Sequence, residues 1–596
     1  MIAPGSIFLH DALAPDGESL LFTSPIEELT AFTPAEALAA LDRIETARAE
    51  GYWIAGYFAY ELGLLFEERL RPLLQQRPEH PLLWLGLYRA PRRLTVSEAS
   101  DYIEAEAQGL SGSAGQLALD MDIGQYGRAF DAIKAYIGAG DAYQVNLTFQ
   151  ARFTLDGDAV ALYRDLALKQ PVAYGALVET GAETILSRSP ELFVESRNGR
   201  LSARPMKGTL ARGRTVAEDE AGVAALAGDP KSRAENLMIV DLLRNDLSRI
   251  SEIGSVTVTD LFTVETYRTL HQMTSGITAR MKPEVTPLEA IRNLFPCGSV
   301  TGAPKIRAME IIRELESGPR GVYTGSIGYI APSGDFRFNV AIRTAVIGKD
   351  GQGKVGIGSG IVADSELAAE YNEALLKLKF LTDPVEPVAL IETMLWEQDK
   401  GFWLLDRHVE RLLLSARYFN IAADEASIRR FVQDSLHDFS APRMRVRLVL
   451  HERDGLSVTA VPLPEAENHV PFRFILAEER VNSNSPLLFH KTTNRAFYDE
   501  PRKAAAARHG VDEVVFRNER DELTEGSITS IFIEHDGQLF TPALQSGLLP
   551  GTLRAELLST GRAREAVLTA ANLQTAEKVF LGNSVRGLMA ATLVTP

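Results

Sequence analysis

The chain has 596 residues, of which 45% are hydrophobic and 24% are charged; this balance is typical of folded domains rather than disordered, collagenous or coiled-coil chains. Its 79 acidic and 62 basic side chains give a formal net charge of −17, so the surface as a whole repels nucleic acids and anionic lipids. The single cysteine, Cys297, excludes a disulfide framework and a four-thiolate zinc site. The sequence has neither a long apolar stretch nor the basic start of a signal peptide. We therefore expect a cytoplasmic protein of several domains, with no nucleic-acid or membrane partner.

Segment 383–388 contains two prolines and two acidic residues and follows a helical pattern, so it marks the strongest break in the chain. It predicts a linker between a first domain at 1–382, with its core at 120–382, and a second domain at 389–596. Strand and helix patterns mix in both halves, which predicts an α+β fold.

Periodic patterns predict the elements in chain order. Helices are expected where apolar side chains recur at helical spacing, over 234–250, 306–315 and 365–380. A meander of three antiparallel strands, separated by turn residues, is expected at 326–330, 337–347 and 355–361. In the second half, short turns between apolar runs predict hairpins over 444–462 and 531–541.

The loop from Phe295 to Lys305 is rich in small residues and precedes a predicted helix. Such loops expose backbone N–H groups to an anion, although an ordinary capped helix explains the same pattern. Cys297 has no histidine nearby in sequence, so a nucleophilic role for it is unsupported.

Acidic residues form a second pattern. Glu366, Glu370 and Glu373 fall on one face of a predicted helix, and Glu235 lies near the start of another. Carboxylates from two helices would share a Mg²⁺ ion. The alternative is a solvated acidic face on each helix, with Lys377 as the partner of Glu373.

Lys207 lies between an apolar residue and Gly208, after a short predicted strand. Burial lowers the pKa of a lysine amine and makes it a nucleophile at neutral pH. A lysine on a surface turn is the alternative interpretation.

Seven segments, in their order and spacing, resemble the chorismate-utilising enzymes over residues 120–382. They are 140–146, 187–191, 205–209, 233–236, 301–305, 341–344 and 358–364. The resemblance implies a two-layer α/β domain with antiparallel sheets that binds chorismate through Mg²⁺.

Within this family, Lys207 resembles the aminodeoxychorismate synthase branch, because anthranilate and isochorismate synthases carry alanine there. The resemblance implies that Lys207 attacks C2 of chorismate as the 4-hydroxyl leaves, that ammonia enters at C4, and that Glu191 is the acid or base for the hydroxyl. It implies Mg²⁺ ligands at Glu235, Glu370 and Glu373, and substrate contacts at Gly208, Thr209, Thr301, Gly302, Tyr323, Arg343 and Gly360. Gln272 stands where many relatives have histidine, and His271, one residue earlier, is given no role.

The nitrogen source is constrained by cysteine usage. A glutaminase needs a nucleophilic cysteine, and Cys297 already belongs to the loop of the chorismate-like half. We therefore expect the chain to use free ammonia or to recruit a glutamine amidotransferase subunit.

The second half resembles fold-type IV pyridoxal-phosphate enzymes over residues 388–596. The matching segments are 405–412, 490–495, 524–527, 549–554 and 581–584. The resemblance implies pyridoxal 5′-phosphate on Lys491, Glu525 at its ring nitrogen, and phosphate contacts at Arg411, Thr552, Leu553 and Asn583. Leu553 replaces a hydroxyl residue of aminotransferase relatives, and the opening strand before Glu392 is expected to be missing. A homodimer through this domain is a further expectation.

Fold type IV includes both lyases and transaminases, so the fold alone does not choose between them. A first half that makes aminodeoxychorismate favours a second half that removes pyruvate from it to give 4-aminobenzoate for folate synthesis, with Lys491 taking the C4 proton. Two alternatives remain: an anthranilate-type synthase fused to a class IV transaminase, and an inactive scaffold. His408 and His490 are expected to be structural.

Overall fold

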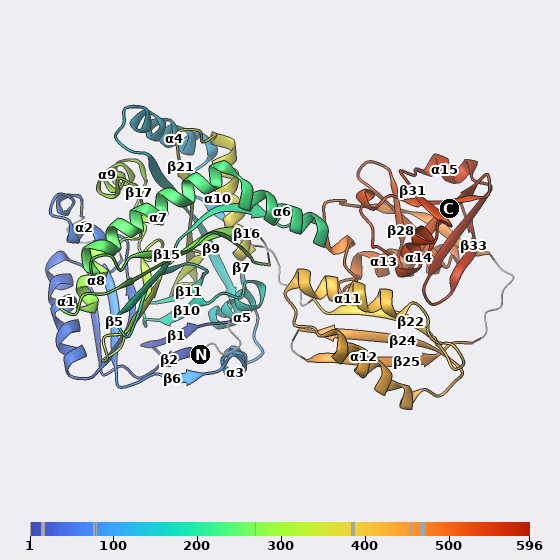
Figure 1. Cartoon of the computed structure of the whole chain (residues 1–596), viewed down its shortest axis with the longest axis horizontal. Helices are drawn as coiled ribbons and strands as arrows, with labels where there is room; N and C mark the ends of the chain where they lie inside the picture. The colour runs from blue at the N-terminus through green and yellow to red at the C-terminus, as the bar shows by residue number, and fades with distance from the viewer. Residues whose placement is uncertain are drawn as a thin grey trace. The chain divides into compact units, whose positions relative to one another are not determined.

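The computed structural model describes residues 2–13, 18–74, 78, 80–268, 270–382, 388–452, 454–464 and 471–595. The predicted linker lies outside these residues except for its last position, as does Arg453 in the turn of the first predicted hairpin. The chain forms two compact units (Figure 1). Unit 1 comprises Met1–Ala211 and Val223–Val385, and unit 2 comprises Arg212–Gly222 and Glu386–Pro596.

The described part of unit 1 contains two large antiparallel sheets. The first, in spatial order, consists of β17 (Gly302–Ala303), β9 (Gln144–Gly157), β21 (Gln352–Ile361), β20 (Thr344–Gly348), β11 (Glu183–Ser189), β10 (Tyr174–Glu179), β1 (Ser6–His10), β2 (Ser19–Phe22) and β6 (Arg92–Leu94), with β7 (Gly112–Ala114) and β8 (Ala118–Leu119) beside β9. The second consists of β14 (Met206–Ala211), β16 (Leu270–Arg280), β13 (Arg200–Arg204), β12 (Leu192–Arg197), β19 (Phe336–Asn339), β18 (Ser326–Ile330), β4 (Trp53–Phe58), β5 (Leu83–Tyr88) and β3 (Glu27–Ala31), with β15 (Thr257–Thr266) beside β16.

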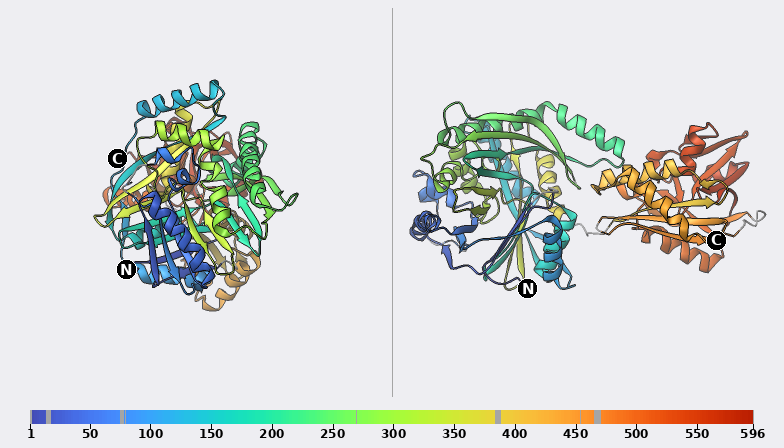
Figure 2. Two further views of the ribbon diagram at one scale, coloured as in Figure 1. Left: turned by 90° about the vertical axis from the view of Figure 1, so that its left-hand side faces the viewer. Right: turned by 60° about the horizontal axis from the view of Figure 1, so that its bottom comes forward.

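Helices cover the outer faces of these sheets (Figures 1 and 2). Those packed on the first sheet are α3 (Val96–Ala107), α4 (Ile123–Gly138), α5 (Ala159–Lys169), α9 (Lys305–Leu315) and α10 (Leu367–Thr382). Those on the second are α1 (Pro34–Ala49), α2 (Leu62–Phe66), α7 (Pro230–Ile250) and α8 (Pro287–Leu294). The predicted helices correspond to α7, α9 and α10, and α7 begins earlier than expected because Asp229 caps it and Pro230 occupies its first turn.

A third core lies between the two sheets, and strand alternation produces it. On β1, Ile7 and Leu9 belong to this central core, whereas Phe8 belongs to the core beneath the helices. On β4, Ala55 faces the central core and Ile54 packs with the helices of the second sheet. The α+β fold class with antiparallel sheets is therefore confirmed.

The predicted three-stranded meander is wrong. β18 and β19 belong to the second sheet, whereas β20 and β21 belong to the first. The expected strand at 337–347 breaks after Asn339, where the chain crosses from one sheet to the other. Arg343, in this crossing, has a φ of 51°. The crossing brings Arg343 to the edge of a cavity, which is described below.

The described part of unit 2 contains two sheets. The smaller consists of β23 (Gly401–Phe402), β22 (Leu390–Glu397), β24 (Arg443–His451) and β25 (Gly455–Pro462), with α11 (Leu405–Phe419) and α12 (Glu425–Asp434) on one face. The larger, mixed sheet consists of β28 (Leu523–Gly526), β27 (Glu513–Asn518), β26 (Phe472–Val481), β33 (Gly587–Leu593), β32 (Lys578–Asn583), β29 (Ser530–His535), β30 (Gln538–Pro542) and β31 (Ala563–Ala566). The remaining helices are α13 (Ala496–His509), α14 (Thr552–Ser559) and α15 (Ala570–Thr575).

Both predicted hairpins of the second half are present, as β24–β25 and β29–β30. The expectation that the opening strand would be missing is wrong, because β22 contains Glu392 and pairs with β24 along its whole length. This strand matters for the site, since the backbone N–H of Ile391 donates a hydrogen bond to the carbonyl of Lys491 at 2.9 Å.

One segment of unit 2 comes from the first half of the sequence. Arg212 makes an ion pair with Asp219 at 2.8 Å and stacks over the ring of Tyr418, with its guanidinium carbon 4.3 Å from the ring centre. It also donates a hydrogen bond to the carbonyl of Tyr418 at 2.9 Å. Helix α6 (Val216–Gly228) begins in this segment and ends in unit 1.

Within the described ranges, no helix is both long and apolar enough to cross a membrane.

Candidate active sites

Unit 1 contains a cavity of about 240 Å³ between the β14 end of the second sheet and the β21 end of the first. Ten of the residues predicted to act here line it: Glu191, Lys207, Gly208, Thr209, Glu235, Tyr323, Arg343, Gly360, Glu370 and Glu373. These residues come from segments far apart in the sequence, and the fold brings them together around one cavity.

Two predicted substrate contacts do not reach the cavity wall. The hydroxyl of Thr301 is fully buried and donates to the carbonyls of Cys297 and Gly298, at 3.1 and 3.2 Å. Gly302 pairs with Val145 in the first sheet, and its φ of 149° leaves no room for a side chain against the backbone of β9. Both residues shape the loop rather than line the cavity.

Glu191 is the most deeply buried of the acids that line this cavity. Only 3% of its surface is exposed, and the hydroxyl of Ser299 donates a hydrogen bond to its Oε1 at 2.6 Å. Burial raises the pKa of Glu191 to about 7, although Ser299 and the amine of Lys207 act in the opposite direction. The carboxyl group therefore has both protonation states available near neutral pH, as a proton donor and acceptor requires.

Lys207 lies against the backbone of β21. A Cβ atom built on Gly360 would lie only 2.4 Å from Nζ of Lys207 and 2.9 Å from Nε2 of Gln144. The side-chain amide of Gln144 is fully buried, and neither of its polar atoms has a partner in the described part of the chain. Gln144 lies inside one of the matching segments but is given no role from the sequence; it packs beside Gly360 and does not line the cavity.

The three predicted metal ligands line the cavity close enough together for the charges of Glu370 and Glu373 to act on Glu235. Glu373 pairs with Lys377 at 2.8 Å, which lowers the pKa of Glu373, whereas burial raises the pKa of Glu235. Glu370 accepts a hydrogen bond from Ser365 at 2.6 Å. In the described residues, no three side chains are grouped closely enough to hold a metal by themselves. Mg²⁺ typically takes one or two carboxylates and completes its shell with water and substrate oxygens, so this acidic wall fits such an ion.

The cavity wall also contains a buried cation, Arg343. Arg343 is 7% exposed, its Nη2 lies 3.4 Å from Oε1 of Gln272, and its Nη1 has no partner in the described structure. Burial lowers the pKa of Arg343 to about 10, so the group stays charged at neutral pH. An unsatisfied, buried guanidinium is suited to a carboxylate ligand. Gln272 thus contacts this arginine.

Cys297 is not an activated nucleophile. Its side chain is 3% exposed, and burial, with the charge of Glu191, raises the pKa of its thiol to about 12. The thiolate that a glutaminase needs is therefore not available at neutral pH.

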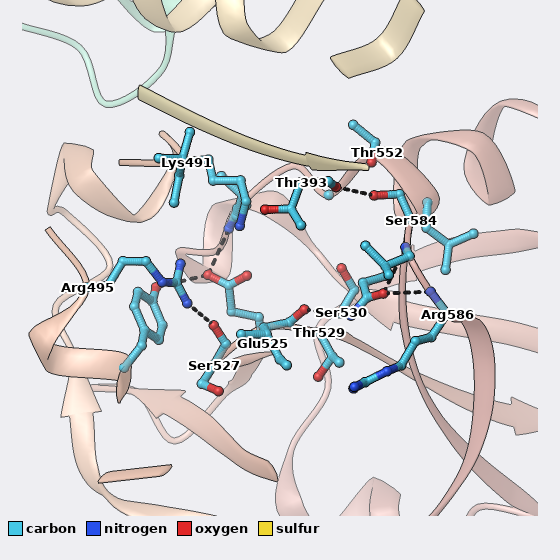
Figure 3. A pocket seen from close by; sticks show the side chains of 18 of the residues that line it. Thr393, Lys491, Arg495, Glu525, Ser527, Thr529, Ser530, Thr552, Ser584 and Arg586 are labelled. Atoms are coloured by element: carbon cyan, nitrogen blue, oxygen red, sulfur yellow. Dashed lines mark hydrogen bonds between the residues drawn. The ribbon is translucent and has the colours of Figure 1, made fainter. Parts of the chain in front are cut away.

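Unit 2 contains a larger cavity, of about 580 Å³, and all six residues predicted to bind its cofactor line it: Arg411, Lys491, Glu525, Thr552, Leu553 and Asn583. In Figure 3, the amine of Lys491 and the carboxylate of Glu525 face each other across this cavity. Burial lowers the pKa of Lys491 to about 7, and the charges of Arg495 and Arg411 act in the same direction. A largely neutral amine at physiological pH is what bond formation to an aldehyde requires.

Glu525 is held by two groups to which the sequence analysis gives no role, Tyr498 and the backbone of Leu549. Its Oε1 accepts hydrogen bonds from the hydroxyl of Tyr498 at 2.9 Å and from the backbone N–H of Leu549 at 3.1 Å. Burial raises its pKa, and these two donors oppose that effect. The carboxylate is thus fixed in orientation, as a partner for a ring nitrogen must be.

The other end of the cavity has the features of a phosphate site. Thr552 begins α14, so the backbone N–H groups of that turn are available to an anion. Arg411 lines the cavity and pairs with the buried Glu392 at 2.6 Å. Burial opposes ionisation of Glu392, but Arg411 and His408 together lower its pKa to about 2. The residues present therefore fit pyridoxal phosphate, and His408 has a structural place beside Glu392, at 2.6 Å.

Two family comparisons agree with this division. Residues 8–383 match the chorismate binding enzyme family, and residues 389–594 match the amino-transferase class IV family. The class IV match implies pyridoxal phosphate in unit 2.

Individual relatives match the first half. The chain is 44% identical to the aminodeoxychorismate synthase of Streptomyces griseus over 266 residues, which are 44% of this chain and 37% of that protein. It is 38% identical to aminodeoxychorismate synthase component 1 of Escherichia coli strain K12, over 56% of this chain and 76% of that one. The chain thus spans well under two thirds of several curated relatives.

A solved structure of anthranilate synthase component I from Streptococcus pneumoniae is also similar, with a TM-score of 0.53 and 28% identity, over 61% of this chain and 92% of that one. The family match covers more than half of the chain, and the cavity of unit 1 carries the residues expected of that family. The chain therefore belongs to the chorismate binding enzyme family, and a class IV aminotransferase domain follows its chorismate-binding domain.

Proposed function

We propose that unit 1 converts chorismate and ammonia to 4-amino-4-deoxychorismate, and that unit 2 removes pyruvate from this intermediate to give 4-aminobenzoate. The observation that carries the proposal is Lys207, a lysine in the wall of a chorismate-family cavity, 2.4 Å from the Cβ position of Gly360. The names of the curated relatives support the first activity. The second activity is supported by a class IV domain on the same chain, which would consume the product of the first.

In the first reaction, Nζ of Lys207 forms a bond to C2 of chorismate, the ring double bonds shift, and the C4–O bond breaks. Glu191 gives its proton to the departing hydroxyl, which leaves as water. Ammonia then forms a bond to C4, the double bonds shift back, and the bond between Lys207 and C2 breaks. Arg343 and the backbone at Gly208 and Gly360 would hold the carboxylates of the substrate.

A divalent cation fits the acidic wall. Mg²⁺, held by Glu235, Glu370 and Glu373, would neutralise the ring carboxylate. The pair between Glu373 and Lys377, at 2.8 Å, would have to open or be shared when the ion binds.

In the second reaction, bound pyridoxal phosphate supplies the electron sink that makes the C4 hydrogen acidic. Lys491 takes this proton, the bond between C3 and the enolpyruvyl oxygen breaks, and the ring becomes aromatic. The enolpyruvate takes up a proton and becomes pyruvate. Glu525 would hold the cofactor at its ring nitrogen, and Arg411, Thr552, Leu553 and Asn583 would hold its phosphate.

The ammonia would come from a partner. Relatives are named component 1 of a synthase, and the buried thiol of Cys297 does not serve as a glutaminase nucleophile. A glutamine amidotransferase subunit is therefore the proposed partner of unit 1. The homodimer through unit 2 stays a prediction.

Product analysis tests the proposal. Chorismate, ammonium and Mg²⁺ are supplied to the chain with and without pyridoxal phosphate. The products are separated by chromatography and identified by mass spectrometry. We expect 4-amino-4-deoxychorismate without the cofactor, and 4-aminobenzoate with an equal amount of pyruvate in its presence. Lys207→Ala should abolish the first product but still convert supplied intermediate. Anthranilate as the product would overturn the proposal for unit 1, and transamination without pyruvate would overturn it for unit 2.

A further inference from the structure

One wall of the unit 2 cavity carries two arginines that no acidic group of the described residues pairs with. Arg445 and Arg447 are exposed and line the cavity, whereas Met444, Val446 and Leu448 between and beside them are buried. Because side chains alternate across a strand, both guanidinium groups lie on the open face of the smaller sheet, opposite α11 and α12. Across the described ranges, neither side chain makes an ion pair or a hydrogen bond.

The strand register links this wall to the cofactor lysine. Ile391 is hydrogen-bonded to Lys491, and Thr393, two residues further along β22, pairs directly with Arg447 on β24. Arg445 follows about 6.6 Å further along the same face. The two guanidinium groups therefore form a row that begins beside the reacting end of the cavity and leads away from it.

Two other arginines of the cavity wall, unlike Arg445 and Arg447, have acidic partners. Arg411 is paired with Glu392 at 2.6 Å, and Arg495 lies 3.8 Å from Asp499. Two like charges on one face of a strand repel each other when nothing lies between them. An unpaired arginine row in a chain of net charge −17 is thus best explained by an anionic ligand that both groups share.

We propose that Arg445 and Arg447 form a dicarboxylate-binding wall, which makes unit 2 selective for a ring amine with two carboxylates over a monocarboxylate amine. The inference rests on the proposed function, because 4-amino-4-deoxychorismate carries a ring carboxylate and an enolpyruvyl carboxylate in addition to its amine. Guanidinium groups pair with carboxylates in a planar, two-point geometry, so each arginine fixes an orientation as well as a charge. Monocarboxylate amines, such as ordinary transaminase substrates, would leave one arginine unpaired.

The test compares two probes that differ only in their second carboxylate. The holoenzyme is titrated with 3-(carboxymethoxy)benzoate and with 3-methoxybenzoate, and binding is followed by the absorption of the bound cofactor, which reports on this cavity alone. The variants are Arg445→Gln, Arg447→Gln, the double variant and the charge-preserving Arg447→Lys. Arg443→Gln is the matched control, since Arg443 lies on the same strand face but outside the cavity and pairs with Glu397 at 3.2 Å.

We expect wild type to bind the dicarboxylate tightly, and each glutamine variant to weaken that binding by about tenfold to a hundredfold, with little change for the monocarboxylate. Arg447→Lys should recover part of the loss, and Arg443→Gln should match wild type. The KM for supplied 4-amino-4-deoxychorismate should rise by the same factor with a smaller change in kcat, because the carboxylates are bound equally before and during the reaction. The cofactor content of each variant should equal that of wild type. If the double variant loses its cofactor, the single variants carry the comparison.

Equal binding of both probes by wild type, or an unchanged preference in the single variants, would overturn the inference. Failure of the proposed function is a separate outcome. If wild type releases no pyruvate but the variants still lose the preference for the dicarboxylate, the arginine wall is supported and the lyase activity is not.

Discussion

At Glu191 and Lys491, burial moves two protonation equilibria toward neutral pH from opposite directions. Loss of water raises the pKa of the acid to about 7 and lowers the pKa of the amine to about 7. Glu191 is the carboxyl group proposed to transfer a proton in the first reaction, and Lys491 is the amine proposed to do so in the second. The same physical effect therefore prepares an acid in unit 1 and a base in unit 2.

Glu191 provides a prediction on stability as well as activity. Its pKa in the folded chain, about 7, is above its ordinary value, so the folded state holds a proton that the unfolded state releases. Stability from this group is fully present below about pH 4.5 and is lost as pH rises through 7, with a slope of at most about 1.4 kcal/mol per pH unit. Urea unfolding of wild type and Glu191→Gln between pH 5 and 8 measures how the free energy of unfolding depends on pH. The variant should lack the part of this dependence that comes from Glu191.

Ser299→Ala serves as the matched variant, because it removes the hydrogen bond that lowers the pKa of Glu191. The midpoint of the pH effect should then move upward. Glu191→Gln should also slow formation of the intermediate by about 10²- to 10⁴-fold, as expected for loss of a proton donor. Identical pH profiles in all three proteins would contradict the assignment.

The residues that could be predicted were those inside recognisable motifs, such as Lys207 and Lys491. Their immediate partners could not be predicted in the same way. Ser299 reaches Glu191 from a loop more than a hundred positions away, and Glu392 looks like any strand residue until α11 brings Arg411 to it. Pairing across such distances depends on the tertiary fold, which local patterns do not encode.

Among the elements, β21 bears most directly on unit 1. Gly360→Ala would place a methyl group 2.4 Å from Nζ of Lys207, so the amine must move from its position. We expect synthesis of the intermediate to fall at least about tenfold, since misplacing a reacting group by about 1 Å has effects of that order or larger. Conversion of supplied intermediate by unit 2 should be unchanged.

Gly138→Ala is the control, because a Cβ atom there meets nothing within 4 Å. Both activities of that variant should equal those of wild type. A Gly360→Ala protein with full synthase activity and an unchanged fold by circular dichroism would show that Lys207 does not act from this position.

Helices were predicted well because their spacing is a local property: α7, α9 and α10 all occur where the apolar repeat required them. The expected strand at 337–347 failed for the opposite reason. The strand-like sequence pattern of 337–347 runs on without a break, whereas the chain itself passes from one sheet to the other through the left-handed backbone at Arg343. Which sheet a strand joins is decided by partners elsewhere in the chain.

For the whole molecule, the nitrogen source is the sharpest test. With glutamine as the sole donor, the chain should make almost no 4-aminobenzoate, because the thiol of Cys297 is buried and its pKa is raised to about 12. Ammonium should restore synthesis, increasingly so toward about pH 9, since only uncharged ammonia attacks C4. Adding an amidotransferase subunit should permit the use of glutamine near pH 7.

Cys297→Ser separates the explanations. It should leave the ammonium-dependent rate unchanged, which is measured as 4-aminobenzoate formed per minute. Glutamine use by the chain alone, abolished by this substitution, would assign Cys297 a nucleophilic role and remove the need for a partner.

The segment Arg212–Gly222 also limits how the chain can be dissected. A fragment that starts at Glu386 would lack these residues, although they belong to unit 2, and the ring of Tyr418 would lose the stacked guanidinium of Arg212. His490 packs against the same ring, with its ring centre 4.3 Å from that of Tyr418, and it immediately precedes Lys491. A separately expressed second half would therefore be defective, and a transplanted lyase module would need Arg212–Gly222 to keep its cofactor lysine in place.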